Sequence, residues 1–272
     1  MLIKEQMAGV FMFCRDRLNK EETAMSRYVA ALDIEWEYFT DKHRELWEGE
    51  DGNGGIKKRI EDFLNGQQPN PIAIRGPIGQ GKTQLLYTAF KFVWLNGGIA
   101  FYSTLDKILP DIATTAAHFA QQIDLAITES IEKLQGGHIK EIPFFTDEMI
   151  KFVENNQNKH KMADKVVFLI DEMERSYAKL LSKVTTDDRS PFGYWLEHTP
   201  HFPVATFAPL SHYEALYGEA EKRRWDSISL PPTTATALRT KDEEFGNFVW
   251  WVSRGRLGIS YKAADSIKKK IH

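Results

Sequence analysis

Short apolar runs alternate with helical segments along most of the chain, beginning near residue 71. Each run is four to six residues long and is bounded by glycine, proline or polar residues, as expected for strands buried in a parallel sheet. The five predicted strands are Pro71–Arg75, Ile99–Thr104, Val166–Ile170, Pro203–Phe207 and Ser227–Leu230.

Segments with apolar residues at helical spacing lie before, between and after these strands. Helices are predicted at Lys20–Glu48, Ile56–Leu64, Lys82–Leu95, Pro110–Gln135, Thr146–Asn155, Glu172–Val184, Ser211–Tyr217, Lys241–Val252 and Ile259–Ile271. The alternation predicts a three-layer α/β domain with a five-stranded, mostly parallel sheet. We expect an N-terminal helical extension (1–48), a core domain (49–239) and a small C-terminal helical lid (240–272).

Length and charge narrow the class of protein. The chain has 272 residues, which fits one large domain or a core with a small appendage. Its net charge is −3, from 35 basic and 38 acidic residues, so it is not a protein that binds nucleic acid over a whole basic face. The basic triplets Lys57–Arg59, Lys222–Arg224 and Lys268–Lys270 leave local contact with nucleic acid open.

The single cysteine, Cys14, excludes an internal disulfide and favours a reducing compartment. The apolar run Met7–Cys14 is too short to span a bilayer, so we expect a cytoplasmic protein without a membrane segment. The eight histidines show no zinc-binding spacing, and His198 and His201 are predicted as surface residues of a loop around Pro200.

A phosphate-binding motif follows the first predicted strand. The pattern G-x-x-x-x-G-K-[ST] is complete from Gly76 to Thr83, and a helix follows it directly, which is the context that the motif requires. Glycines let the backbone amides curl around a phosphate, Lys82 supplies a positive charge to the β- and γ-phosphates, and the Thr83 hydroxyl is a ligand for Mg²⁺. The residues expected to bind the nucleotide are Gly76, Pro77, Ile78, Gly79, Gln80, Gly81, Lys82, Thr83 and Gln84.

Two carboxylates end the third predicted strand. Asp171 and Glu172 follow five apolar residues, and the carboxyl ends of parallel strands are where such sheets bind ligands. We expect Asp171 to hold Mg²⁺, directly or through water, and Glu172 to activate the attacking water. A guanine-reading element is lacking, since the nearest candidate, Asn158–Lys161, has no carboxylate. The motifs together predict a P-loop NTPase that uses ATP and Mg²⁺.

These motifs resemble the AAA+ superfamily and the related STAND switch ATPases, in particular the branch of origin-recognition initiators and transposon or defence regulators. The segment Tyr38–Leu46 is similar to the one that lines the adenine site in this branch, and Thr206 to the polar sensor residue of the fourth strand. Arg224, or its neighbour Arg223, corresponds to the arginine finger, which completes the site of a second subunit or partner protein. The segment Ser253–Gly258 resembles the start of the lid's sensor helix, although Gly258 stands where the family has its arginine.

The resemblance implies an ATP-hydrolysing module that acts as a nucleotide-dependent switch or motor in a larger assembly, with a homo-oligomer or another protein as partner. Arg254 or Arg256 would then replace the lid arginine. The helical region Pro110–His160 is longer than a compact core needs, and it is either a cover for the sheet or a surface for a partner.

Two other functions stay open at this point. A STAND-type switch would hold its nucleotide tightly and barely turn over. A small-molecule kinase would use the same loop for phosphoryl transfer, but the adjacent Asp171 and Glu172 favour hydrolysis, which needs a water-activating carboxylate.

Overall fold

The computed structural model of the chain describes residues 41–49, 54–77, 80–104, 115–156, 165–173, 191–207 and 225–230. The strands of this part of the chain are β1 (Ile72–Arg75), β2 (Ile99–Thr104), β3 (Val166–Asp171), β4 (Phe202–Phe207) and β5 (Asp226–Ser229). They form one sheet in the order β2-β3-β4-β1-β5, and all four pairings are parallel. The predicted five-stranded sheet is confirmed, and each strand boundary lies within one residue of the predicted one.

The burial of each strand follows from its place in the sheet. All six residues of β3 are buried, because this strand has a neighbour on each side and helices over its faces. Strand β5 lies at one edge of the sheet and alternates partly buried with exposed residues. An unbroken apolar run such as Val166–Ile170 is therefore typical of a strand inside a parallel sheet.

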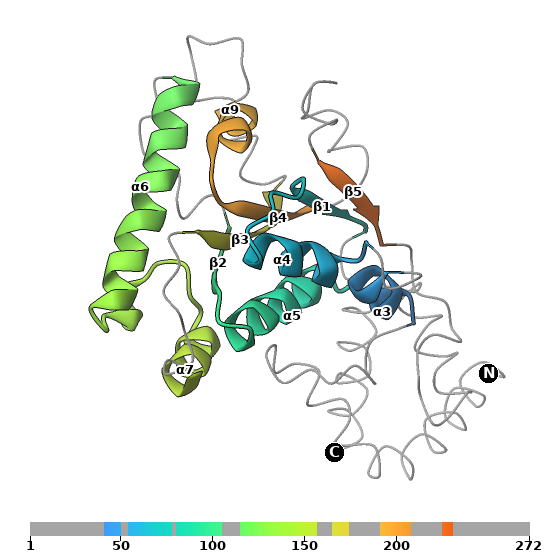
Figure 1. Cartoon of the computed structure of the whole chain (residues 1–272), viewed down its shortest axis with the longest axis horizontal. Helices are drawn as coiled ribbons and strands as arrows, with labels where there is room; N and C mark the ends of the chain where they lie inside the picture. The colour runs from blue at the N-terminus through green and yellow to red at the C-terminus, as the bar shows by residue number, and fades with distance from the viewer. Residues whose placement is uncertain are drawn as a thin grey trace, which may run out of the picture.

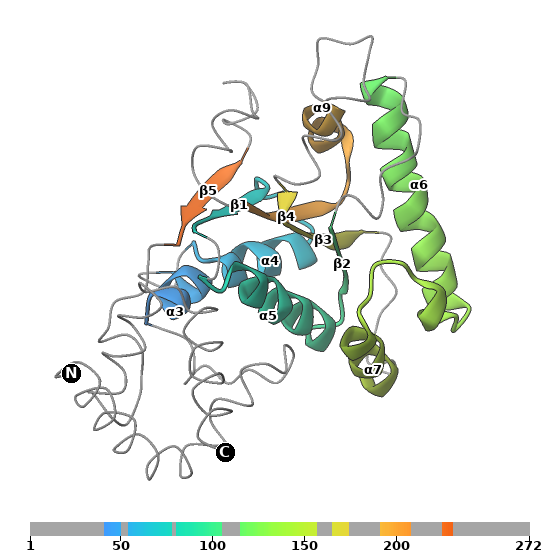
Figure 2. The same ribbon diagram turned by 180° about the vertical axis from the view of Figure 1, so that it is seen from behind.

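Helices cover the sheet in layers (Figures 1 and 2). The described helices are α3 (Asp41–Glu48), α4 (Ile56–Leu64), α5 (Lys82–Leu95), α6 (Ala116–Gln135), α7 (Asp147–Asn156) and α9 (Pro191–His198), with a short 3₁₀ turn η3 (Ile139–Glu141). Helix α5 packs on β2 and β3 and contacts α4, which in turn contacts α3. Helix α6 packs along α9, away from α3. None of the helices in these ranges combines the length and the apolar character needed to cross a lipid bilayer.

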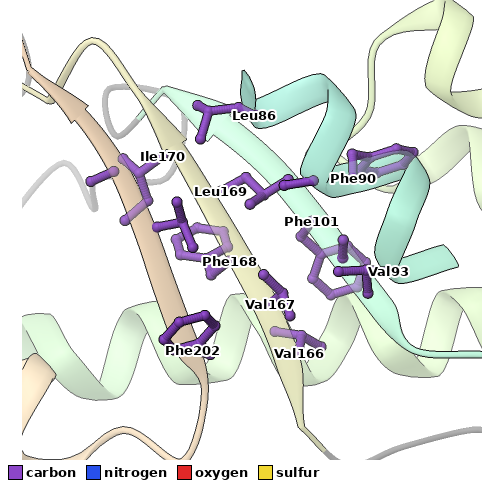
Figure 3. Packing of buried hydrophobic residues seen from close by; sticks show 14 of the residues in the cluster. Leu86, Phe90, Val93, Phe101, Val166, Val167, Phe168, Leu169, Ile170 and Phe202 are labelled. Carbon is purple, nitrogen blue, oxygen red and sulfur yellow. The ribbon is translucent and has the colours of Figure 1, made fainter. Parts of the chain in front are cut away.

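The core lies between α5 and the sheet. Figure 3 shows Leu86, Phe90 and Val93 of α5 projecting over β2 and β3, and all three are fully buried. On the other side of β3, the Phe168 ring meets the Trp195 ring of α9 edge to face, with 5.9 Å between the ring centroids. Side chains alternate between the two faces of a strand, so Phe168 and its neighbour Leu169 join different layers. The P-loop follows β1 and Asp171 ends β3, so both lie at the carboxyl ends of the strands of this packed sheet.

Two local predictions are wrong, and one helix was missed. Helix α6 begins at Ala116 rather than Pro110, because Thr115 is extended and its side chain accepts a hydrogen bond from the His118 amide as an N-cap. Helix α9 was not predicted. His201 is buried rather than exposed, and its Nδ1 accepts a hydrogen bond from the Val166 amide.

Other predictions fall outside the described residues. These are the part of Lys20–Glu48 before Asp41, nearly all of Glu172–Val184, the helices Ser211–Tyr217, Lys241–Val252 and Ile259–Ile271, the arginines Arg223, Arg224, Arg254 and Arg256, and the loop residues Ile78 and Gly79.

Candidate nucleotide site

The P-loop leaves β1 between two other segments of backbone. The Gly76 amide donates to the Phe207 carbonyl of β4, and the Leu230 amide donates to the Arg75 carbonyl. A Cβ on residue 76 would lie 2.7 Å from the Leu230 carbonyl oxygen, a distance that no side chain tolerates. The first glycine of the motif is therefore required by the close approach of the chain after β5.

The second glycine of the motif lies against a buried histidine of α3. Gly81 has φ 84°, a left-handed conformation that favours glycine, and a Cβ there would lie 2.9 Å from His43 Nε2. His43 Nε2 is 2.8 Å from the Gln80 carbonyl oxygen. Because a carbonyl only accepts, Nε2 is the protonated nitrogen of this ring. Burial lowers the pKa of His43, so the imidazole is neutral at neutral pH.

Lys82 folds back over the loop that precedes it. Its Nζ donates to the Gly76 carbonyl at 2.7 Å and to the Pro77 carbonyl at 2.9 Å, and the side chain is buried. The ammonium thus lies inside the curl of the loop. Helix α5 begins at Lys82, so the positive end of its dipole is directed toward the same place. The arrangement concentrates positive charge where the loop can surround an anion.

Asp171 lies opposite the start of α5 and joins the loop to the sheet. The Thr83 hydroxyl donates to Asp171 Oδ2 at 2.7 Å, so the two predicted metal ligands are in direct contact. The Thr206 hydroxyl of β4 donates to Oδ1 through a short hydrogen bond. Three elements that are far apart in the sequence therefore meet at one carboxylate.

Thr206 also holds the turn that follows β3. The Glu172 amide is 3.0 Å from Thr206 Oγ1 and 3.0 Å from Asp171 Oδ1. Glu172 itself has φ 50°, a left-handed conformation that is unusual for a residue with a side chain. The two hydrogen bonds that its amide donates hold the backbone in this conformation. Thr206 itself is fully buried.

Two tyrosines complete the surroundings of Asp171, and neither was predicted from the sequence. The Tyr102 hydroxyl donates to Asp171 Oδ2 at 2.9 Å. The Tyr102 ring packs on the Tyr87 ring with 5.0 Å between the centroids. Burial and the neighbouring Asp171 charge raise the pKa of Tyr102 well above its ordinary value, so this phenol keeps its proton and acts as a donor. The signal in the sequence is a polar-tipped residue near the end of the strand beside β3.

The residues of this site fit a magnesium nucleotide. Within the described ranges no group of three histidine, cysteine or carboxylate side chains could hold a metal ion by itself. Mg²⁺ in phosphate-binding sites is typically held by one or two protein oxygens together with phosphate oxygens and water, and Thr83 and Asp171 offer such hard oxygen atoms. Lys82 and the N-terminus of α5 match the charge of the phosphates. Thr83 and Asp171 are therefore the pair that would hold the ion.

No family model and no curated protein sequence matches the chain. Several solved structures are similar to it. The ORC1 protein of Aeropyrum pernix in complex with DNA has 14% identity and a TM-score of 0.45, over 85% of this chain and 60% of that one. The RuvB Holliday junction branch migration motor of Thermotoga maritima has 11% identity and a TM-score of 0.42, over 82% of this chain and 64% of that one. The replication initiator DnaA, bound to AMPPCP and single-stranded DNA, has 14% identity and a TM-score of 0.40, over 88% and 67%.

All three are AAA+ P-loop ATPases. The matches cover 60 to 67% of the length of these three structures.

The basic triplet on α4 is engaged within the chain. Lys58 Nζ lies 2.6 Å from an Asp62 carboxylate oxygen, and an Arg59 guanidinium nitrogen lies 2.7 Å from Asp226 Oδ2 of β5. Lys57 Nζ lies 5.8 Å from the centre of the Phe92 ring. All three side chains of this triplet therefore have contacts within the chain, and these contacts explain its charge without a nucleic acid.

Proposed function

We propose that the chain binds ATP with Mg²⁺ in this site and hydrolyses it to ADP and phosphate, as an AAA+-like module that switches or drives a larger assembly. The observation that carries the proposal is the contact of Thr83 with Asp171, beside a lysine whose ammonium donates to the Gly76 and Pro77 carbonyls of its own phosphate-binding loop. A surface turn that happened to match the motif would have no reason to bring these groups together.

Each residue has a role in this proposal. The backbone amides of the loop and the Lys82 ammonium bind the phosphates, and the Thr83 hydroxyl and Asp171 hold the metal ion. When bound, Mg²⁺ neutralises charge on the phosphate oxygens. Glu172 takes a proton from the attacking water, whose oxygen bonds to the γ-phosphorus while the bond to the bridging oxygen of ADP breaks. Thr206 keeps Asp171 and the Glu172 amide in place, and Arg224 of a second subunit or a partner meets the γ-phosphate.

The experiment is a measurement of nucleotide affinity and of phosphate release with purified protein and its Lys82→Ala variant. Hydrogen bonds to charged groups contribute about 1.5–3 kcal/mol, so loss of the ammonium should weaken ATP binding about tenfold or more and abolish hydrolysis. Lys151→Ala is a matched control, because Lys151 is an exposed lysine of α7. If Lys82→Ala binds and hydrolyses ATP like the wild type, this loop is not the nucleotide site.

Two further measurements separate the rival functions. A STAND-type switch would carry ADP through gel filtration and release little phosphate. A kinase would form a phosphorylated product when candidate acceptors are added. The partner of the module, whether a second copy, another protein or nucleic acid, is part of the proposal, and mixing two inactive variants tests the case of a second copy.

A further inference from the structure

The Asp171 carboxylate accepts four hydrogen bonds. Oδ2 accepts from the Thr83 and Tyr102 hydroxyls, and Oδ1 accepts from the Thr206 hydroxyl and the Glu172 amide. Donors from α5, β2, β4 and the turn after β3 therefore fix the carboxylate in both position and orientation.

Tyr102 reaches this carboxylate from the neighbouring strand. In the parallel register of β2 and β3, Tyr102 pairs with Leu169 and Thr104 pairs with Asp171. Residues two apart on a strand share a face, so Tyr102 and Asp171 lie on the same face of the sheet, offset by two residues along the strands. A tyrosine is long enough to span that offset, whereas a serine or threonine at this position is not.

A second tyrosine closes a ring of contacts back to the P-loop helix. Tyr87 lies four residues after Thr83 on α5, so both side chains project from the same face of the helix. Tyr87 packs on the Tyr102 ring, with 5.0 Å between the ring centroids. The contacts run from Thr83 to Asp171, to Tyr102, to Tyr87 and back to α5. Such a ring fixes the helix that carries Thr83 relative to the strand that carries Asp171.

We propose that Tyr102, supported by Tyr87, is a positioning residue for the magnesium site. This inference rests on the proposed function. A hydroxyl has one proton and two lone pairs, so a Thr83 proton directed at Asp171 Oδ2 leaves the lone pairs of Thr83 for the metal ion. Tyr102 keeps Oδ2 in the place where it receives that proton. It acts through Asp171 and touches neither the nucleotide nor the ion.

The test is Tyr102→Phe in the full chain, which removes the hydroxyl and keeps the ring that packs on Tyr87. The probes are a fluorescent ATP analogue and MgCl₂, with nucleotide affinity measured in EDTA and then at rising Mg²⁺ concentration. Loss of a group that orients a metal ligand typically costs about 10–100-fold in metal affinity, so half-saturation should require about tenfold more Mg²⁺ or above. Affinity in EDTA should stay within about twofold of the wild type, because the phosphate-binding loop is unchanged.

Two further variants keep the test specific. Tyr87→Leu should shift the Mg²⁺ titration in the same direction by a smaller factor, since it removes the ring that packs on Tyr102. Tyr194→Phe is the matched control, because Tyr194 is a partly buried tyrosine of α9 that stacks on His198. That variant should titrate like the wild type.

The outcomes separate the inference from the proposed function. If wild-type protein binds the analogue in a Mg²⁺-dependent manner and Tyr102→Phe has the same or a tighter half-saturation, the positioning role is wrong and the nucleotide site stands. If Tyr102→Phe weakens binding equally in EDTA and in Mg²⁺, the tyrosine supports the fold only, and the inference is also wrong. If the wild type binds no nucleotide under any condition, the proposed function fails, and this inference fails with it.

Discussion

Glu172 combines a strained backbone with the position expected for the catalytic base. Its φ of 50° costs a residue with a Cβ about 1–2 kcal/mol, and hydrogen bonds from its amide to Asp171 and Thr206 hold it there. Strain of this kind is tolerated where the surrounding contacts fix the chain. The turn after β3 therefore holds the backbone of Glu172 in a fixed conformation, and this conformation lowers the stability of the folded chain.

We expect Glu172→Gly to be more stable than Glu172→Gln, by about 0.5–1 kcal/mol, because glycine adopts this conformation without strain but loses more entropy on folding. Both variants should bind ATP, and both should lose about two to four decades of turnover, the range for loss of a general base. Urea unfolding and phosphate release measure the two effects. Equal stability of the two variants would show that the left-handed turn is not strained, and wild-type turnover in Glu172→Gln would move the catalytic base elsewhere.

Sequence reasoning found the residues of this site that belong to a contiguous motif and missed those that depend on register. Thr83 and Asp171 were predicted to serve one ion, and the structure places them in contact. Tyr102 could not be found in the same way, because its contact with Asp171 depends on the register of β2 and β3, in which Tyr102 pairs with Leu169, two residues before Asp171. The same holds for His43, whose contact with the Gln80 carbonyl depends on where α3 docks.

At the scale of helices and strands, the sequence predicted the elements whose bounds are set by neighbouring residues in the chain. The bounds of α4 and α5 match the prediction at both ends, since glycines and prolines flank them. Helix α9 was missed because it begins with Pro191 and contains Gly193, a poor helix former. Tertiary contacts stabilise it instead: Trp195 is fully buried, and its indole Nε1 donates to Asp124 Oδ1 of α6 at 2.7 Å.

The contact between His201 and β3 makes the stability of the sheet depend on pH. Burial, with a smaller effect from Lys165, lowers the pKa of His201 from 6.5 to about 4. The unfolded chain takes up this proton at higher pH than the folded chain, so the stability is present above pH 6.5 and is lost as pH falls toward 4. The loss amounts to roughly 3 kcal/mol at one group, since each pKa unit corresponds to about 1.4 kcal/mol.

His201→Asn should therefore lose less stability than the wild type between pH 6.5 and 4, because the amide oxygen still accepts from the Val166 amide but takes up no proton in this range. Urea unfolding at several pH values measures the difference in slope. His43, whose pKa is also lowered by burial, contributes to both proteins equally and cancels in the comparison. Parallel pH profiles for the two proteins would mean that His201 is not the titrating group.

At the scale of the whole molecule, the parallel strands have all their carboxyl ends on one side of the sheet and all their amino ends on the other. The P-loop follows β1, and Asp171 ends β3, so both lie at the carboxyl edge of the sheet. Asp226 begins β5 at the opposite, amino end of the strands, where its amide donates to the Pro71 carbonyl before β1. A strand of four residues separates the edges by about 10 Å. This arrangement follows from the order and the direction of the strands. The alternating pattern of the sequence predicted the parallel direction but not the order.

Arg224 lies outside the described residues and directly precedes Trp225 in the sequence. Our proposal assigns Arg224 a role in the site of a second molecule rather than in its own. A guanidinium that meets the γ-phosphate of a neighbour stabilises charge in the transition state and contributes about 10³-fold or more to turnover. Arg224→Ala should therefore bind ATP normally and lose most of its turnover, and wild-type turnover per molecule should rise with protein concentration.

Mixing two inactive variants tests whether the site is shared. A Lys82→Ala subunit retains Arg224, and an Arg224→Ala subunit retains its nucleotide site, so a mixture should recover part of the activity that neither has alone. Recovery should be greatest near equal amounts, because mixed contacts are then most frequent. Arg223→Ala in place of Arg224→Ala tests the neighbouring arginine: activity without mixing leaves the role with Arg224, and activity that only mixing restores assigns it to Arg223. Should Arg224→Ala hydrolyse ATP at the wild-type rate at every concentration, or should the mixture stay inactive, Arg224 does not complete a neighbour's site, and the assembly must be sought through another surface of the molecule.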